Sequence, residues 1–387
     1  MSDPMLALQN YEIKTKRQNK EQSEKLFNQS LKDYCYNYDL NIIDVKVLEY
    51  FKQDIYFKPK RRNLNLDIPK TIRITLSYDK DKSRIIINDY IFDKFLQKGG
   101  FGSVFKFRPK FRKIGISGFA VKIIVSNNTF PSINKSIISE LKIINQTRET
   151  ECLFIKSKNF MIDHESYDLM DYDQYFIYRH LQHNVCMTLT CMPLADGDTY
   201  DLNENMLLNL KQKKELFGYI VSTLRCVLLN HNLVYSDIKL AQVLYFDCKL
   251  PDGSNKFIFV LGDLGGFQEF NDPPVITHGP NWKYINKYNL KPINLAMYAL
   301  ASTWHELYSP YNLRQDYRTH SKHNIMFKYK FDLPYINHIK SRIGIVPTLS
   351  QQRDIISKLL CLDPKKFKKP DSLIHYLNKL LITQNTF

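Results

Sequence analysis

The sequence lacks paired cysteines, an apolar leader and any apolar run of membrane length. None of its seven cysteines forms a C-x-x-C pair, and most lie in apolar segments, where cysteine behaves as a small hydrophobic residue. No run approaches the roughly 18 apolar residues of a membrane span, and no signal-like region opens the chain. We therefore expect no membrane span and an intracellular, reducing location, cytoplasmic or nuclear.

Acidic residues are also in short supply, because 39 Asp and Glu face 55 Lys and Arg, for a formal charge of +16. Such an excess favours polyanionic partners, including nucleic acid, anionic membrane surfaces and acidic proteins. However, Asn, Lys, Ile and Tyr are abundant throughout, which an AT-rich coding sequence produces without selection for binding. The charge alone leaves both explanations open.

The length of 387 residues, 44% of them hydrophobic, suits one bilobal unit or two domains plus an extension. Residues 1–89 are predicted to form an N-terminal extension in three parts. These are a helical segment that becomes apolar over Leu40 to Phe51, a basic linker at Lys58 to Arg62, and a β-hairpin over Ile74 to Ile87.

The segment from Asn232 to Gly266 has the pattern of a second hairpin. Its apolar runs, Val243 to Phe246 and Phe257 to Leu261, are separated by a Pro-Asp-Gly-Ser turn. Asp237 precedes the first run and Asp263 follows the second, so pairing brings both carboxylates to one end. With Lys239 nearby, these groups could hold a metal-bound phosphate and position a hydroxyl. Ordinary turn residues beside core strands are the alternative.

Upstream, β-prone flanks bracket the glycine turn Gly99-Gly100-Phe101-Gly102, whose backbone amides can approach phosphate oxygens. A strand carrying Lys122 follows, and Glu140 comes 18 residues later (140 minus 122) in a segment with helical apolar spacing. A surface ion pair in an α+β domain is the alternative explanation for Lys122 and Glu140. The order of glycine turn, strand lysine and helix glutamate is the more specific pattern.

These segments together resemble the eukaryotic protein-kinase family. The family's H-R-D-L-K-P-x-N is matched by the residues from Tyr235 to Gln242, and its D-F-G by Asp263-Leu264-Gly265. The resemblance implies that Asp237 orients the substrate hydroxyl and that Lys239 steadies the transferred phosphoryl. It further implies that Asp263 and Gln242 bind magnesium.

The same resemblance implies an ATP site built from the upstream segments. Lys122 would hold the α- and β-phosphates and pair with Glu140, and Met192 would be the gatekeeper. The remaining residues implied in nucleotide binding are Gly99, Gly100, Gly102, Val104, Ala120, Pro193, Leu194 and Ala195.

Several family landmarks are replaced. Gln97 stands for the first loop glycine, Ser236 for the arginine before the catalytic aspartate, and Gln242 for the asparagine that helps bind the second magnesium. Ala296 stands for the aspartate that braces the catalytic loop, and no A-P-E follows the D-x-G segment.

The expected fold is therefore an α+β, bilobal, protein-kinase-like domain over residues 90–381. Its small, mainly antiparallel β lobe with one helix covers about 90–195, and its larger helical lobe covers about 196–381. The implied function is transfer of the γ-phosphoryl of ATP, with Mg²⁺, to Ser or Thr hydroxyls of a protein substrate. A pseudokinase that binds nucleotide or acts as a scaffold is one alternative, and a basic nucleic-acid-binding protein is another.

Overall fold

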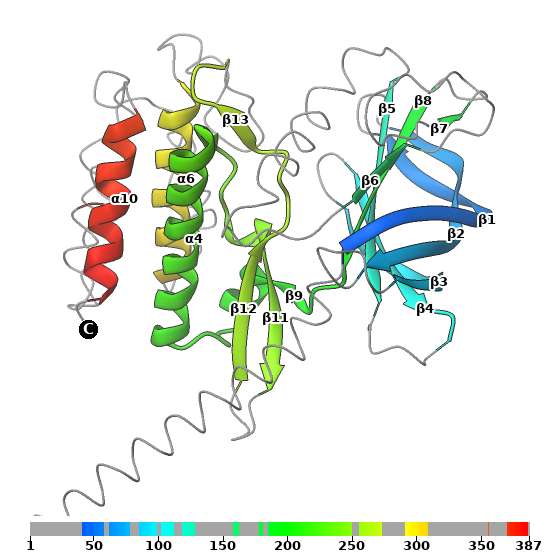
Figure 1. Cartoon of the computed structure of the whole chain (residues 1–387), viewed down its shortest axis with the longest axis horizontal. Coiled ribbons are helices and arrows are strands. Elements are labelled where there is room, and N and C mark those ends of the chain that lie inside the picture. Colours follow the sequence, from blue (N-terminus) through cyan, green and yellow to red (C-terminus); the bar gives the residue numbers. More distant parts are fainter. Residues whose placement is uncertain are drawn as a thin grey trace, which may run out of the picture. The chain divides into compact units, whose positions relative to one another are not determined.

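The chain combines antiparallel sheets with a small number of helices (Figure 1). The computed structural model describes residues 41–57, 62–77, 85–98, 102–111, 118–127, 158–161, 178–180, 185–249, 255–272, 291–308, 355 and 370–385. The described residues form two compact units, and the chain passes from the first to the second after Leu194. The outer part of a later hairpin, Phe246–Ile258, is grouped with the first unit.

The first unit is an antiparallel sheet in the order β1-β2-β3-β4-β5-β8-β6, with β7 also paired to β8. Its strands are β1 (Asn41–Phe57), β2 (Arg62–Ser77), β3 (Ile85–Lys98), β4 (Ser103–Pro109), β5 (Phe119–Asn127), β6 (Lys158–Met161), β7 (Tyr178–His180) and β8 (Val185–Pro193).

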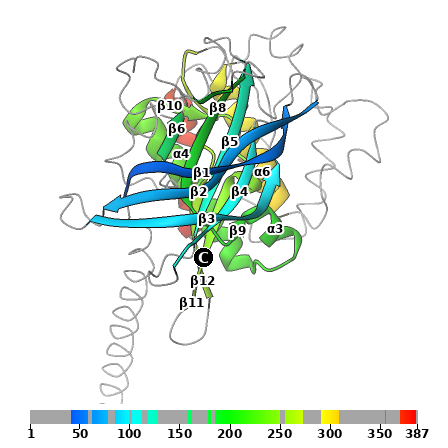
Figure 2. The ribbon, with the colours of Figure 1, turned by 90° about the vertical axis from the view of Figure 1, so that its right-hand side faces the viewer.

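This sheet is curled, so that β1, β2 and β3 cross in front of β5 and β8 (Figure 2). Alternate residues of each strand point to one face, and their apolar side chains fill the inside of the curl. β2 contributes most, with Leu66, Ile68, Ile74 and Leu76 fully buried. The sheet thus has a core of its own, to which β1, β3, β4, β5 and β8 also contribute.

The helix expected over Leu40 to Phe51 is wrong for its described residues, because Asn41 to Phe51 belong to β1. β1 pairs with β2 along its length, from Asn41 opposite Ser77 to Phe57 opposite Arg62. β-branched and aromatic side chains are common in this segment and suit a pleated surface, while a partner far along the chain supplies the hydrogen bonds. The spacing of apolar residues within Leu40 to Phe51 could not show that β2 would be its hydrogen-bonding partner.

The hairpin expected over Ile74 to Ile87 is confirmed, since Ser77 pairs with Ile85 and Ile74 with Asn88. β3 continues through residues 89 and 90, where the extension was expected to end, so the sheet is continuous across that position. Of the expected basic linker, only Arg62 lies within the described residues, as the first residue of β2.

The second unit contains helices, a small sheet of β10 and β13, and β9, which pairs with the base of the hairpin of β11 and β12. The elements after Leu194, including the outer part of that hairpin, are β9 (Gly197–Asp198), α3 (Thr199–Glu204), α4 (Leu210–His231), β10 (Leu233–Tyr235), η2 (Leu240–Gln242), β11 (Val243–Lys249), β12 (Asn255–Leu261), β13 (Phe267–Glu269), α6 (Pro292–Tyr308) and α10 (Pro370–Asn385).

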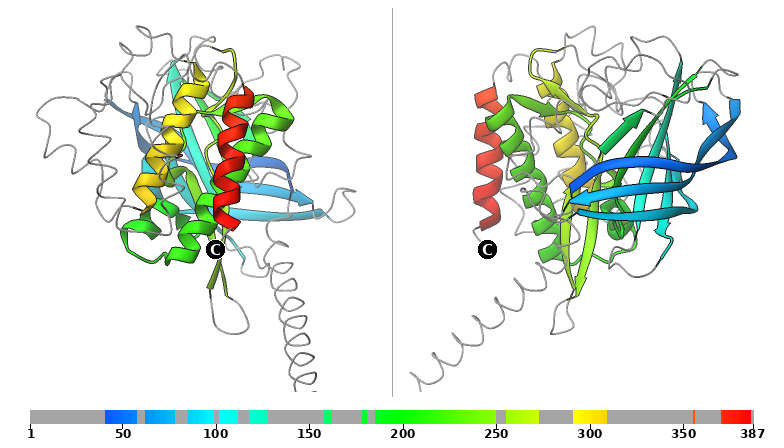
Figure 3. Two further views of the ribbon diagram at one scale, coloured as in Figure 1. Left: turned by 90° about the vertical axis from the view of Figure 1, so that its left-hand side faces the viewer. Right: turned by 45° about the vertical axis from the view of Figure 1, so that its right-hand side comes forward.

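Helices α4, α6 and α10 lie side by side (Figure 3). α4 begins with a capping box, in which Asn209 and Gln212 exchange side-chain to backbone hydrogen bonds. Its buried face includes Leu216, Phe217 and Ile220, the apolar spacing of an amphipathic helix.

No helix among the described residues is long and apolar enough to cross a membrane. Cys191 on β8 is a free thiol inside the first unit's core.

Candidate catalytic site

The hairpin of β11 and β12 places two acidic residues at its base, as the pattern predicted. β10 leads into Asp237, and β12 ends just before Asp263. The backbone N–H of Gly262 donates to the carbonyl of Gln242 at 2.8 Å and closes the base of the hairpin. β10 and β13 then pair, with Tyr235 opposite Phe267, so both acidic segments are fixed at each end.

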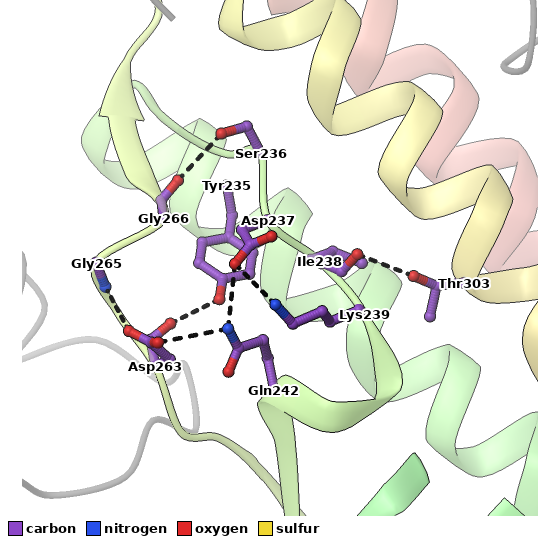
Figure 4. Close-up of polar contacts among 10 residues, drawn as sticks. All are labelled: Tyr235, Ser236, Asp237, Ile238, Lys239, Gln242, Asp263, Gly265, Gly266 and Thr303. Atoms are coloured by element: carbon purple, nitrogen blue, oxygen red, sulfur yellow. Dashed lines mark hydrogen bonds and ion pairs between the residues drawn. The ribbon is translucent and has the colours of Figure 1, made fainter. Parts of the chain in front are cut away.

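Asp237 is the central acid of this site and is almost fully buried, with a side chain 8% exposed. Its Oδ2 accepts hydrogen bonds from Lys239 Nζ at 3.2 Å and from Gln242 Nε2 at 3.1 Å (Figure 4). Burying a carboxylate is costly unless it is paired and hydrogen-bonded. The ammonium and the amide offset that cost and fix the direction of the carboxylate.

Gln242 also links Asp237 to the second acid, because its Nε2 lies 3.4 Å from Asp263 Oδ2. The other carboxylate oxygen of Asp263 accepts the backbone N–H of Gly265 at 3.2 Å. One amide group therefore touches two carboxylates that are 26 residues apart in the chain (263 minus 237). The predicted site residues Asp237, Lys239, Gln242 and Asp263 form a single polar cluster.

The donor set of this cluster fits a magnesium ion in kind. Mg²⁺ is usually held by one or two carboxylates together with substrate phosphates. Asp263 supplies a carboxylate, and Gln242 supplies a carboxamide oxygen once its amide turns, since Nε2 now points at the carboxylates. Among the described residues, no group of three or more His, Cys, Asp and Glu could hold a metal ion. A metal at this cluster would therefore also need the Gln242 oxygen or substrate phosphates as ligands.

Tyr235 holds the two acidic segments together in a way that the sequence did not predict. Its hydroxyl donates a 2.6 Å hydrogen bond to the backbone carbonyl of Asp263. Its ring packs on Phe267, with centroids 4.6 Å apart. A Cβ on Gly266 would lie 2.6 Å from the Tyr235 ring, so only glycine allows this approach.

Ser236, the residue before Asp237, contacts residues about 30 positions later in the chain. It receives a 2.8 Å hydrogen bond from Gln268 Nε2, and its backbone N–H donates to the carbonyl of Gly266 at 3.2 Å. Gln268 is buried on β13. Ser236 thus ties the segment before Asp237 to β13 and carries no positive charge.

Two buried threonines hold the backbone around the acids. Thr303 Oγ1 on α6 lies 3.1 Å from the carbonyl oxygen of Ile238 and 2.8 Å from that of Ala299 in its own helix. Thr199 Oγ1 on α3 donates to the carbonyl of Leu240 at 2.9 Å. The contact between Thr303 and the loop backbone is one that no motif predicted.

Thr199 is placed by the cap of α3. Asp198 is the N-cap residue, and its carboxylate accepts the backbone N–H of Asp201 at 3.0 Å. Burial raises the pKa of the Asp198 carboxyl above its ordinary value.

In the first unit, strand register places the residues expected to bind nucleotide on one face. Val104 pairs with Lys122, and Ala120 pairs with Met192. Directly paired residues share a face, and residues two apart along a strand do as well. Val104, Ala120, Lys122 and Met192 therefore lie on the face opposite the core residues of β5, which include Val121.

The remaining expected nucleotide residues are only partly described. Gly102 needs to be glycine, since a Cβ there would lie 2.5 Å from the carbonyl oxygen of Ile123. Pro193 ends β8, and the backbone N–H of Leu194 donates to the carbonyl of Gly118 at 3.3 Å. Gly99, Gly100 and Glu140 lie outside the described residues. Ala195 belongs to the second unit.

The sequence matches no protein-family model and no curated protein.

Proposed function

We propose that this chain is a divergent protein kinase that transfers the γ-phosphoryl of ATP to Ser or Thr hydroxyls of a protein substrate. The observation that carries the proposal is the cluster of Asp237, Lys239, Gln242 and Asp263 at the base of one hairpin. Catalysis of phosphoryl transfer consists almost entirely of positioning and charge stabilisation. A cluster of this kind, held on both sides by strands, can supply both.

Each group in the cluster has a role in this reaction. The substrate hydroxyl oxygen bonds to the γ-phosphorus as the bond from that phosphorus to the β,γ-bridging oxygen breaks, and ADP leaves. The Asp237 carboxylate accepts the hydroxyl proton. Lys239, held 3.2 Å from Asp237, neutralises charge on the transferred phosphoryl. Asp263 and Gln242 would hold Mg²⁺, which would supply positive charge to offset the charge that develops on the phosphates.

The rest of the chain supports an α+β, bilobal kinase-like fold. The first unit is an antiparallel sheet that presents Val104, Ala120, Lys122 and Met192 on one face, and the second contains α4, α6 and α10. Aliphatic side chains on a sheet face suit an adenine ring, and a lysine among them suits phosphate. We assign ATP binding to this face of the first unit.

A pseudokinase is the second candidate, and Gln242 is the observation that favours it. Its amide nitrogen donates to both carboxylates, where a metal-binding residue must present oxygen. A chain in which this amide cannot turn would keep the fold without efficient transfer.

The deciding experiment is transfer of radiolabelled phosphate from ATP to the protein itself and to casein, with Mg²⁺. Asp263→Asn should lower transfer by about 100-fold or more because it weakens the hold on Mg²⁺, and Lys122→Met should do the same because it removes a positive charge assigned to phosphate binding. Asp272→Asn, at an exposed site on the same unit, is the matched control and should not change the rate. Transfer that survives Asp263→Asn would rule out the proposed role of the cluster. Nucleotide binding without transfer in the wild type would establish the pseudokinase instead.

A further inference from the structure

The sheet of the first unit has a pocket of about 380 Å³ on its surface. Its lining comes from β1, β2 and β3 and from the residue that follows β4, so the sheet alone forms it. The lining residues are Glu49, Phe51, Lys70, Thr71, Ile91, Phe92 and Lys110. None of them takes part in the candidate catalytic site, and a pocket of this size suits a small ligand or a few peptide residues.

Irregular strand pairing surrounds the pocket. Between β1 and β2, Thr71 pairs with Glu49 and Pro69 with Tyr50, which leaves Lys70 as an extra residue. Between β3 and β4, the register shifts again directly after Phe92. Such bulges bend a strand, re-aim its side chains and are common beside binding sites. Here two of them flank the same hollow.

The floor of the pocket is aromatic and firmly packed. Phe51 and Phe92 meet edge to face, with centroids 4.9 Å apart. Phe92 in turn contacts Phe105 at 5.7 Å and Phe107 at 6.0 Å, two residues buried in the core. The half-buried rings therefore present apolar surface from a rigid base, which favours an aromatic or bulky aliphatic guest.

The rim of the pocket carries an excess positive charge. Glu49 is already satisfied, since its Oε2 lies 3.2 Å from Lys70 Nζ and 3.3 Å from the Thr71 hydroxyl. The hydrogen bond and the charge of Lys70 lower the pKa of the Glu49 carboxyl below its ordinary value. Lys110 lies within 4 Å of no acid in the described part of the chain, although its charge acts on Glu49 and Asp89 and its Nζ lies 5.9 Å from the centre of the Phe111 ring. Its ammonium is the charge available to a guest.

We propose that this pocket binds a segment of a partner protein in which a bulky aromatic side chain stands next to a carboxylate. The ring would lie on Phe51 and Phe92, and the carboxylate would pair with Lys110 and accept a hydrogen bond from it. This binding is separate from phosphoryl transfer and does not depend on it.

The test is calorimetric titration of the full chain, without nucleotide, against three blocked hexapeptides with glycine and serine flanks. The first contains phenylalanine followed by aspartate, the second replaces aspartate with asparagine, and the third replaces phenylalanine with alanine. We expect the asparagine peptide to bind about fivefold more weakly, as for one exposed charge pair. The alanine peptide should bind at least about tenfold more weakly, because it buries no ring.

Variants of the protein test whether Lys110 is the residue that pairs with the aspartate of the peptide. Lys110→Gln should weaken binding of the aspartate peptide about fivefold and leave the asparagine peptide unchanged. Lys46→Gln, at an exposed site on β1 outside the pocket, is the matched control and should have no effect. Lys110 is exposed, so the variant should keep its melting temperature.

Equal binding of the aspartate and asparagine peptides, or no loss in Lys110→Gln, overturns the proposal. Free N-acetylphenylalanine binding more tightly than the first peptide would also overturn it, in favour of a small carboxylate ligand.

Discussion

The phenol of Tyr235 donates a 2.6 Å hydrogen bond to the backbone carbonyl of Asp263, across 28 residues of sequence. This bond joins the residue that ends β10 to the first residue of the D-x-G segment. Because the Tyr235 side chain is fully buried, water cannot replace the bond once it is lost. The position of one candidate metal ligand is thus tied to the strand that positions the candidate base.

Tyr235→Phe should therefore impair positioning more than nucleotide binding. Removing the hydroxyl leaves a carbonyl without its donor, which should cost about 1–2 kcal/mol in the free energy of unfolding, as measured by urea denaturation. We expect kcat for phosphoryl transfer to fall about tenfold, with KM for ATP nearly constant. Tyr235→His, which can still donate, should restore part of the loss. A variant with unchanged kcat would show that this hydrogen bond has no catalytic role.

Thr303→Val should loosen the loop that carries Asp237 and Lys239. Valine has nearly the same shape but has no hydroxyl, whereas Thr303 Oγ1 lies 3.1 Å from the Ile238 carbonyl and 2.8 Å from the Ala299 carbonyl of its own helix. Loss of the shared donor should lower the free energy of unfolding by about 1–3 kcal/mol, measured by denaturant titration. Thr303→Ser keeps the hydroxyl and should lose less. Equal losses in the two variants would assign the effect to packing rather than to the hydrogen bond.

Patterns local in the sequence predicted the parts of the site that depend on local structure. Two apolar runs around a turn gave the hairpin of β11 and β12, and the acids at its ends are brought to one base. The contacts that hold the base together were not predicted, because they join distant residues. Thr303 contacts Ile238 across 65 residues, and Thr199 contacts Leu240 across 41.

The fold of the first unit shows the same limit. The β2–β3 hairpin was predicted, since its strands are neighbours and a turn separates them. β1 was mistaken for a helix, because its short apolar run is compatible with either period until its partner is known. The bulges that flank the pocket also depend on register between strands, which side-chain type alone does not specify.

Gln242→Asn should raise the rate of phosphoryl transfer. In the wild type the Gln242 amide nitrogen contacts Asp237 at 3.1 Å and Asp263 at 3.4 Å. To bind a metal, the side chain must give up these bonds and turn its oxygen inward on a chain one methylene longer than asparagine. Mg²⁺ demands near-ideal octahedral geometry at about 2.0–2.1 Å, so the longer side chain should fit it poorly.

We therefore expect slow transfer by the wild type and an increase in kcat of about fivefold or more in Gln242→Asn, measured at saturating ATP and Mg²⁺. Gln242→Leu, which has no oxygen to offer, is the matched control and should be slower than the wild type. Mn²⁺ should narrow the difference between wild type and the asparagine variant, because it is the larger ion and tolerates a less regular set of ligands. If both proteins bind nucleotide but neither transfers phosphate with Mg²⁺ or Mn²⁺, the chain is a pseudokinase, and the cluster around Asp237 is a structural remnant.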